Sequence, residues 1–394
     1  MPLIRLTQTL TAFACCASLA FTSLAFAEES GSERVAESID LAVEALLGMQ
    51  EGESKAEWPY EGVYRVRNPD PKGRERHIIP LGYRVGGTSI VGSAVLTAPG
   101  FSGSADRRQA VERAAEFVCA AIQDPLMDAD YDGGYDVRVW GYIYALDFLL
   151  LLEREDVLAG KPAKAARKAA HFYLASLQAT AIPKSGGWNY SRGSSLKEPS
   201  PTSPFMTGPA LQVLFAAEAQ GYRVKKKIVE EALEALERSR VDSGEVLYSS
   251  RRGGRSRGGQ LPGSVGRMLV TETTLHLAGQ GSLSRVRGSI DAFLVHWDWL
   301  DKRRAKNGTH IAPYGVAPYY FYYAHYYAGQ AIEQLPKAER EEYRRRLREL
   351  LFEVRLEKGL WNDRVFERTA NYGTACAVMA LGYAQRSAPA RWGK

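Results

Sequence analysis

The sequence predicts an all-α protein, a closed (α/α)6 toroid in which six helical hairpins form an inner and an outer layer of helices. Two observations predict this fold. Amphipathic helical segments alternate with segments that are apolar on nearly every face, and the pair recurs six times along the chain. A helix without a polar face must be covered on all sides, so we expect the apolar set inside and the amphipathic set around it.

The amphipathic segments share an apolar stripe at helical spacing. The first shows it at Ile39, Ala42, Val43, Leu46 and Leu47, with acidic residues between them. The same spacing recurs around Val111, Ala170, Leu233, Ile290 and Leu347. We predict an outer helix at each of these six positions.

The apolar segments begin near Gly87, Val137, Met206, Gly263, Pro318 and Tyr372. They recur at intervals of roughly 50 to 70 residues, the length of one helical hairpin with its loops. The last segment, 372–383, is as apolar as the middle ones, whereas an open α-solenoid needs a polar cap. We therefore predict a closed ring with the helix near Ile39 beside the helix near Tyr343, and few strands.

The first residues have the pattern of a secretory signal peptide. Arg5 precedes an apolar run from Leu10 to Leu24, which ends in Ala25-Phe26-Ala27 before acidic residues. The run is shorter than the roughly 20 apolar residues that span a bilayer. We expect residues 1–27 to be a cleaved signal peptide and residues 28–394 to form one exported toroid domain, periplasmic or extracellular, without a transmembrane segment.

Charge and cysteine usage exclude several classes of function. The chain has 51 Lys and Arg against 45 Asp and Glu, a net charge of +6, with no nucleic-acid-reading motif, so we expect no nucleic-acid partner. Cys119 and Cys376 lie inside apolar helical patterns and are expected to be buried hydrophobes rather than a disulfide or a metal site.

The turns that precede the inner helices are rich in glycine and aromatic residues. Three carry Asp132-Gly133-Gly134-Tyr135, Gly186-Gly187-Trp188 and Gly359-Leu360-Trp361. A glycine suits the left-handed cap of an outer helix, and the aromatic ring then packs on the helix end. Hairpins with such turns resemble the repeats of the terpenoid cyclase and protein prenyltransferase superfamily, including its exported bacterial members of unknown function. The resemblance implies an α/α toroid around a central ligand cavity.

The catalytic signatures of that superfamily are absent from this chain. For a cyclase, the resemblance implies an Asp-x-Asp-Asp motif that supplies the acid. For a prenyltransferase, it implies an Asp-x-Cys pair that binds zinc, and neither motif occurs in this sequence. Asp128, Asp130 and Asp132 open like a calcium loop, but the twelfth position is Val139 rather than glutamate. We expect no metal and no cofactor, with calcium at this acidic turn as the weaker alternative.

The fifth inner segment is unusually rich in tyrosine. Tyr319, Tyr322, Tyr323 and Tyr326 share one helical face. A buried hydroxyl needs a partner, so an apolar core would more readily contain leucine or phenylalanine. These four residues are therefore candidates for lining a ligand cavity, and packing between the two layers is the alternative.

Charged groups inside the apolar segments are the candidates for acid–base chemistry. Asp147, Glu218, Arg267, Glu272 and His276 must each reach a cavity or find a partner. For Arg267 and Glu272 we expect partners on neighbouring inner helices, and we expect both to reach one cavity with Tyr322 and Tyr323. The candidate catalytic residues are Glu272, His325 and Asp363, with structural ion pairing as the alternative.

Parallel inner helices would present all their N-termini, with partial positive charge, at one end of the barrel. We expect an electropositive ligand entrance there. Its predicted residues are Trp58, Arg84, Asp136, Trp140, Trp188, Arg192, Arg267, Tyr314 and Asp363. The alternative is that the arginines pair with nearby acids and tie the loops together.

Three functions remain open on the sequence. The leading one is a protein that binds an apolar or amphipathic ligand, with isoprenoids among the candidates, in an aromatic-lined cavity. The second is a carbohydrate-active lyase or glycosidase on an α/α barrel, which would use a pair of carboxyl groups. The third is a protein-interaction scaffold with its centre filled by side chains.

Overall fold

The computed structural model describes residues 32–61, 79–131, 137–190, 200–250, 258, 260–306 and 308–393. Within these ranges the chain is helical, and extended pairing is limited to isolated bridges. The inner helices are α2 (Leu81–Thr97), α4 (Arg138–Arg154), α6 (Pro204–Ala219), α8 (Val265–Leu277), α10 (Tyr320–Ile332) and α12 (Thr369–Leu381). The outer helices are a first helix over 32–48, α3 (Ala105–Ala120), α5 (Gly160–Ala179), α7 (Lys226–Glu237), α9 (Leu283–Asp301) and α11 (Lys337–Glu353).

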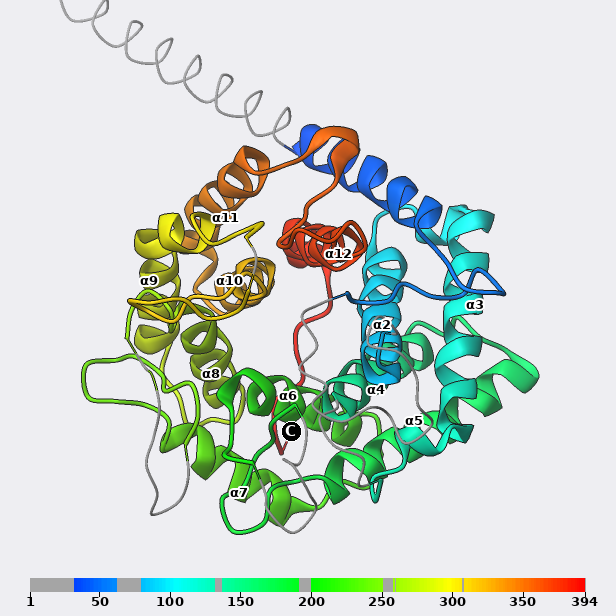
Figure 1. Ribbon diagram of the computed structural model, residues 1–394, viewed down its shortest axis with the longest axis horizontal. Coiled ribbons are helices and arrows are strands. Elements are labelled where there is room, and N and C mark those ends of the chain that lie inside the picture. The colour runs from blue at the N-terminus through cyan, green and yellow to red at the C-terminus, as the bar shows by residue number, and fades with distance from the viewer. Residues whose placement is uncertain are drawn as a thin grey trace, which may run out of the picture.

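The inner helices form a closed ring (Figure 1). Each contacts the next in the order α2, α4, α6, α8, α10, α12, and α12 contacts α2 again. The outer helices pack against this ring, for example α3 on α2, α5 on α4 and α9 on α8. The predicted toroid of six hairpins is confirmed, because each predicted segment is a helix in the expected layer.

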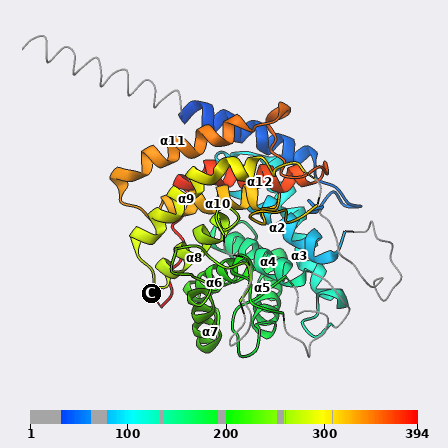
Figure 2. The same cartoon turned by 60° about the vertical axis from the view of Figure 1, so that its left-hand side comes forward.

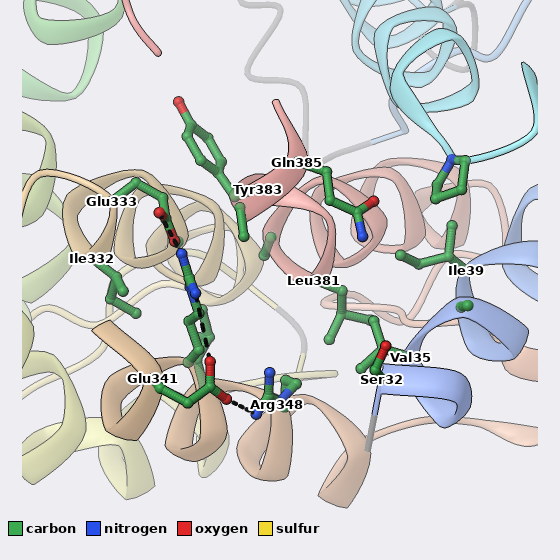
Figure 3. A pocket seen from close by; sticks show the side chains of 17 residues that line it. Ser32, Val35, Ile39, Ile332, Glu333, Glu341, Arg348, Leu381, Tyr383 and Gln385 are labelled. Atoms are coloured by element: carbon green, nitrogen blue, oxygen red, sulfur yellow. Dashed lines mark hydrogen bonds and ion pairs between the residues drawn. The ribbon is translucent and has the colours of Figure 1, made fainter. Parts of the chain in front are cut away.

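The first helix closes the outer layer beside α11, as predicted (Figure 2). The guanidinium of Arg34 lies 4.4 Å from the ring centroid of Phe352, and Arg355 donates to Ser38 Oγ at 3.0 Å. A cavity of 160 Å³ lies at this seam, between the first helix, α11 and the ends of α10 and α12 (Figure 3). On the opposite side, Arg107 of α3 donates to Asp40 at 2.8 Å.

Three tryptophans bind the hairpins in the same way. The indole N–H of Trp58, Trp188 and Trp361 donates to a carbonyl oxygen in the last turn of the preceding outer helix. These acceptors are Leu46, Leu177 and Leu351, at 2.7, 2.8 and 2.8 Å. The backbone N–H of each tryptophan donates to a threonine of the following inner helix. These threonines are Thr88, Thr207 and Thr374, at 2.9, 3.0 and 2.9 Å.

The turn before Trp188 requires both of its glycines. Gly186 and Gly187 each have a φ of +73°, which L-residues with a side chain rarely adopt. A Cβ on Gly186 would lie 2.1 Å from the carbonyl oxygen of Glu231, and one on Gly187 would lie 2.6 Å from Thr207 Oγ1. The glycines therefore allow the turn to pack directly against the helices on both sides.

Cys119 and Cys376 are free thiols in helices, as expected, and Cys376 is buried whereas Cys119 is only partly buried. Burial raises the pKa of the Cys119 thiol to about 11 and also raises that of Cys376. None of the helices among the described residues is both long enough and apolar enough to span a bilayer. The predicted signal peptide lies outside the described residues, so its cleavage stays a prediction.

Candidate functional site

A central cavity of 470 Å³ lies toward the carboxyl ends of the inner helices. Its wall comes from the second halves of α4, α6 and α10 and from the segment after α12, residues 383–390. Ala219, Ser387 and Ala388 line it and are exposed, so the cavity reaches the surface at this end. The predicted entrance is at the opposite end of the ring.

Tyrosine rings and aliphatic side chains make up much of the cavity wall. Tyr144, Tyr326, Tyr327 and Tyr383 face it, together with Ile143, Leu150, Leu151 and Val213. A smaller cavity of 20 Å³, about the size of one water molecule, shares Tyr144, Asp147 and Tyr326 with the central cavity. The rest of its lining is Ile90, Ser93, Tyr323, Tyr372, Cys376 and Met379.

Asp147 and Arg386 supply the charge within the cavity. Asp147 projects from the middle of α4, an otherwise apolar helix, and burial raises its pKa against the opposing effect of Arg386. The Arg386 guanidinium lies 5.4 Å from the ring centroid of Tyr383 and 5.9 Å from that of Tyr326. Burial lowers the pKa of Arg386, but the two tyrosines and Asp147 outweigh that effect and raise it.

The segment that carries Arg386 crosses the carboxyl ends of the inner helices (Figure 1). Its far end is anchored by Trp392, whose backbone N–H donates to the carbonyl oxygen of Leu277 at 3.3 Å. The Trp392 ring also packs on Phe215 of α6, with centroids 5.5 Å apart. Residues 386–390 are thereby held across the cavity between α12 and α6.

Aromatic side chains pack together at the amino ends of the neighbouring inner helices α2, α4 and α12. The Trp140 ring lies 5.4 Å from Tyr83, 5.7 Å from Tyr60 and 5.1 Å from Tyr144, measured between centroids. Gly86 makes room for it, because a Cβ there would lie 2.3 Å from the Trp140 ring. Trp140 therefore belongs to a packed layer above the central cavity.

Other residues of the predicted entrance hold the loops in place. Trp58 and Trp188 are fully buried and form the hydrogen bonds between helices described above. Arg84 donates to both carboxylate oxygens of Glu57 at 2.6 Å, which matches the alternative in which arginines pair with nearby acids. Tyr314 packs edge-to-face on Trp299 at 4.9 Å. Asp136 and Arg192, like Asp132 of the calcium alternative, lie outside the described residues.

Arg267 and Glu272 both have partners in the protein. Arg267 is buried and donates to the carbonyl oxygens of Val246 and Gly263 and to the Tyr320 hydroxyl. Glu272 binds Arg240 and lies 3.8 Å from Arg285 of α9. The expectation that Glu272 pairs within the inner layer is wrong, because its side of α8 faces the outer helices.

His325 lies in the packing between α9 and α10. Its Nε2 accepts from the indole N–H of Trp297 at 2.9 Å, and its Nδ1 lies 2.7 Å from the carbonyl oxygen of Phe321. These contacts suit the neutral ring with a proton on Nδ1. Burial lowers the pKa of His325 to about 4. This arrangement is that of a structural histidine with both nitrogens satisfied.

Asp363 is fully buried in the turn after Trp361, and neither carboxylate oxygen accepts a hydrogen bond from another described residue. Burial raises its pKa to about 7 against the opposing effect of Arg364. A carboxyl group with this pKa can exchange a proton near neutrality. Asp363 does not line the central cavity, so its catalytic role stays a prediction.

The four tyrosines predicted to share a face have different surroundings. Tyr326 lines the central cavity, and Tyr323 lines the smaller one and stacks on Phe205 with centroids 4.0 Å apart. Tyr322 is fully buried against Gly373 of α12. The Tyr319 hydroxyl lies 3.0 Å from His310 Nε2. Successive residues of an α-helix point about 100° apart, so Tyr322 contacts α12 while Tyr323 faces the smaller cavity.

Several residues of the cavity wall are not among the predicted ligand-binding residues. Asp147 is predicted, as a charge inside an apolar helix, to reach a cavity or find a partner, and Tyr144 lies one turn before it on the same face. Tyr383 is the last residue of the predicted segment 372–383, and Arg386 follows that segment in a short stretch without periodicity, so neither carried a signal for a cavity. Their place in the cavity follows from the path of the chain after α12.

Among the residues that the structure describes, no three His, Cys, Asp or Glu side chains are grouped closely enough to hold a metal ion. Arg138 instead binds the acidic turn through the carbonyl oxygens of Asp128 and Tyr131. Calcium binding at Asp128 and Asp130 stays a prediction, since the third carboxylate is outside the described ranges.

No protein-family model matches the sequence, and no curated protein matches it. Solved structures share the fold. A variant of the type II terpene cyclase MstE from Scytonema, in complex with geranylgeranyl dihydroxybenzoate, has a TM-score of 0.51 and 15% identity, over 90% of this chain and 97% of that chain. An inactive variant of the α-1,6-mannanase GH76A of Salegentibacter sp., in complex with α-1,6-mannotetrose, has a TM-score of 0.56 and 12% identity, over 89% and 99%.

The Lin0763 protein from Listeria innocua is a third such structure, with a TM-score of 0.52 and 12% identity over 89% of this chain and 97% of that chain. The resemblance to terpenoid-cyclase toroids is thus confirmed at the level of the fold. Identities this low carry no information about the reaction.

Proposed function

We propose that this protein binds an amphipathic small molecule with a long apolar body, a class that includes isoprenoids, in the central cavity. The observation that carries the proposal is a 470 Å³ cavity lined by tyrosine rings and aliphatic side chains, with few charged groups. This volume is within the range of small-molecule pockets, about 300 to 1,000 Å³. The geranylgeranyl compound bound to the toroid MstE is a ligand of the same class.

Carbohydrate hydrolysis is less well supported by the cavity. Glycosidases use two carboxyl groups that flank the scissile bond. Among the described residues that line the central cavity, Asp147 is the single carboxylate. A scaffold without a small-molecule site would need a centre filled by side chains, whereas the described residues leave a cavity of 470 Å³ between α4, α6 and α10.

We also propose that the protein is exported after cleavage near residue 27. The support is the basic, apolar and small-residue pattern of the first residues. Expression of the full chain with its own leader, followed by measurement of the intact mass of the periplasmic protein, tests the position of the cleavage site. A chain that keeps Met1 and remains in the cytoplasm would contradict export.

The binding proposal is tested on the protein purified from its export compartment. Small molecules are extracted and identified by mass spectrometry, and binding of dodecanol and of α-1,6-mannotetrose is measured by calorimetry. Ala216 lines the cavity, so Ala216→Phe should reduce binding of the apolar probe by filling the space. Ala165 lies exposed on outer helix α5, and Ala165→Phe is the matched control.

An apolar molecule in the extract, and probe binding that is weakened by Ala216→Phe but not by Ala165→Phe, would support the proposal. Binding of the oligosaccharide alone would favour the carbohydrate function instead. Absence of any bound molecule and of probe binding in the folded protein would overturn the proposal.

A further inference from the structure

The charged and polar side chains of the central cavity differ in whether they already have hydrogen-bond or ion-pair partners within the protein. Arg154 is at the rim, where its Nε lies 3.0 Å from Glu155 Oε1 and both side chains are more than 40% exposed. Gln212 and Gln330 donate to each other at 2.9 and 2.8 Å, and Gln330 also donates to the Tyr383 hydroxyl. These three residues offer a ligand little that is not already paired.

Arg386 differs from them. Its Nη1 is buried without a hydrogen-bond partner among the described residues, although the guanidinium lies beside the rings of Tyr326 and Tyr383. Arg386 takes part in none of the ion pairs of the described residues, and its influence on Asp147 acts through space. A guanidinium is always charged and only donates, so Nη1 lacks an acceptor oxygen, even though the side chain of Tyr326 interacts with the guanidinium.

Asp147 does not fill that need. The carboxyl group of Asp147 acts on Arg386 only through space, without a hydrogen bond, and burial raises its pKa. A cationic head group would meet two arginines, Arg154 and Arg386, and one carboxyl group, Asp147. An anionic oxygen forms the stronger, charge-assisted hydrogen bond with arginine.

We propose that the ligand of the central cavity carries an anionic oxygen head group, a carboxylate or a phosphate monoester, which binds Arg386 while the apolar body lies along Tyr144 and Tyr326. The inference rests on the proposed function and adds the chemical class of the head group. Arg386 is presented by the segment after α12, so the polar end of the ligand lies against residues 386–390 and the apolar body points into the ring.

Four probes with the same twelve-carbon chain test this inference on the mature protein: dodecanoate, dodecyl phosphate, dodecan-1-ol and dodecylamine. Below the solubility limit of dodecan-1-ol and the critical micelle concentrations of the charged probes, calorimetry or displacement of one fluorescent probe gives the dissociation constants. We expect an anion to bind about 10-fold tighter than the alcohol, the effect of one hydrogen bond to a charged group. The tighter of dodecanoate and dodecyl phosphate identifies the head group.

Arg386→Gln should remove this preference and leave binding of dodecan-1-ol unchanged, whereas Arg386→Lys should keep part of it because the charge remains. Arg391→Gln is the matched control, since Arg391 is exposed on the same segment and does not line the cavity. Melting temperatures of all variants report whether they fold, and the comparison of the four probes on the native protein needs no variant.

Two failures can be told apart. If the alcohol or the amine binds the native protein as tightly as both anions, the anionic head group is wrong and the binding proposal stands. If none of the four probes binds, the proposed function itself fails. An anion preference that survives unchanged in Arg386→Gln would assign it to another residue and overturn the role of Arg386.

Discussion

The indole N–H of Trp361 donates a 2.8 Å hydrogen bond to the carbonyl oxygen of Leu351, in the last turn of α11. The backbone N–H of the same residue donates to Thr374 Oγ1 of α12 at 2.9 Å. One side chain thus joins the end of an outer helix to the beginning of the next inner helix. The same geometry at Trp188 and Trp58 makes it a repeated feature of the ring, and it explains why these tryptophans are buried.

Thr374→Val should lower the free energy of unfolding by about 1 to 3 kcal/mol, because the buried backbone N–H of Trp361 loses its acceptor. Thr273→Val on α8 is the matched control: its hydroxyl is buried without a partner among the described residues, so its removal should be neutral or stabilising. Urea unfolding of both variants measures the difference. Equal losses in the two variants would contradict a specific role for the Trp361 contact.

Asp363 should make the protein less stable as pH rises from about 4 to 7. Its pKa is raised from 3.8 to about 7 in the folded chain, so the folded state keeps a proton that the unfolded state releases in this range. The stabilisation is full below pH 3.8 and is lost as pH rises through 7, by at most about 4 kcal/mol. Urea unfolding at several pH values should show that the free energy of unfolding falls less between pH 4 and 7 in Asp363→Asn than in the native chain. An unchanged pH dependence would show that Asp363 is ionised in the fold.

His325 should make the protein less stable as pH falls below about 6.5, the opposite of the pH dependence expected from Asp363. Its pKa falls from 6.5 to about 4, so its stabilising contribution is full above 6.5 and is lost as pH falls through 4. Protonation would also place an N–H against the indole N–H of Trp297. His325→Leu should therefore be less stable at neutral pH but lose less stability between pH 6.5 and 4 than the native chain. Chemical denaturation between pH 6.5 and 4 measures the free energy of unfolding of both proteins. A steeper fall in the variant than in the native chain would show that His325 is not held neutral by burial.

Glu272→Gln should reduce stability without affecting the ligand site. Its carboxylate is buried and binds Arg240 of the outer layer, so we expect a loss of roughly 1 to 3 kcal/mol in the free energy of unfolding. The dissociation constant for dodecanoate should not change. Glu339→Gln is the control, because it removes a half-exposed partner of Arg287, where screening leaves little effect. Weaker dodecanoate binding by Glu272→Gln with unchanged stability would assign Glu272 to the cavity.

Sequence analysis located the elements better than the site. The stripe at Ile39, Ala42 and Val43 predicted the first helix, because an amphipathic segment can bury only one face, and the apolar last segment predicted the closed ring that places this helix beside α11. Of the residues predicted to bind a ligand, Tyr326 faces the central cavity and Tyr323 faces its smaller neighbour. Trp58 and Trp188 instead form hydrogen bonds that join an outer helix to the next inner helix. An aromatic residue in the turn before an inner helix fits a ligand-binding role and this structural role equally well, so the sequence could not separate them.

The sequence by itself determined the number, order and layer of the helices, since those follow from which faces are apolar and from the glycine turns between them. Only the tertiary structure decided where the ring is hollow. The cavity depends on side-chain volume summed across helices far apart in the chain, with Trp140 packed among other aromatic rings near the amino ends of α2, α4 and α12 and Tyr326 bordering open space farther along the ring. The position of Arg386 depends likewise on a segment without periodicity, whose path is fixed by the contact of Trp392 with Leu277 and Phe215.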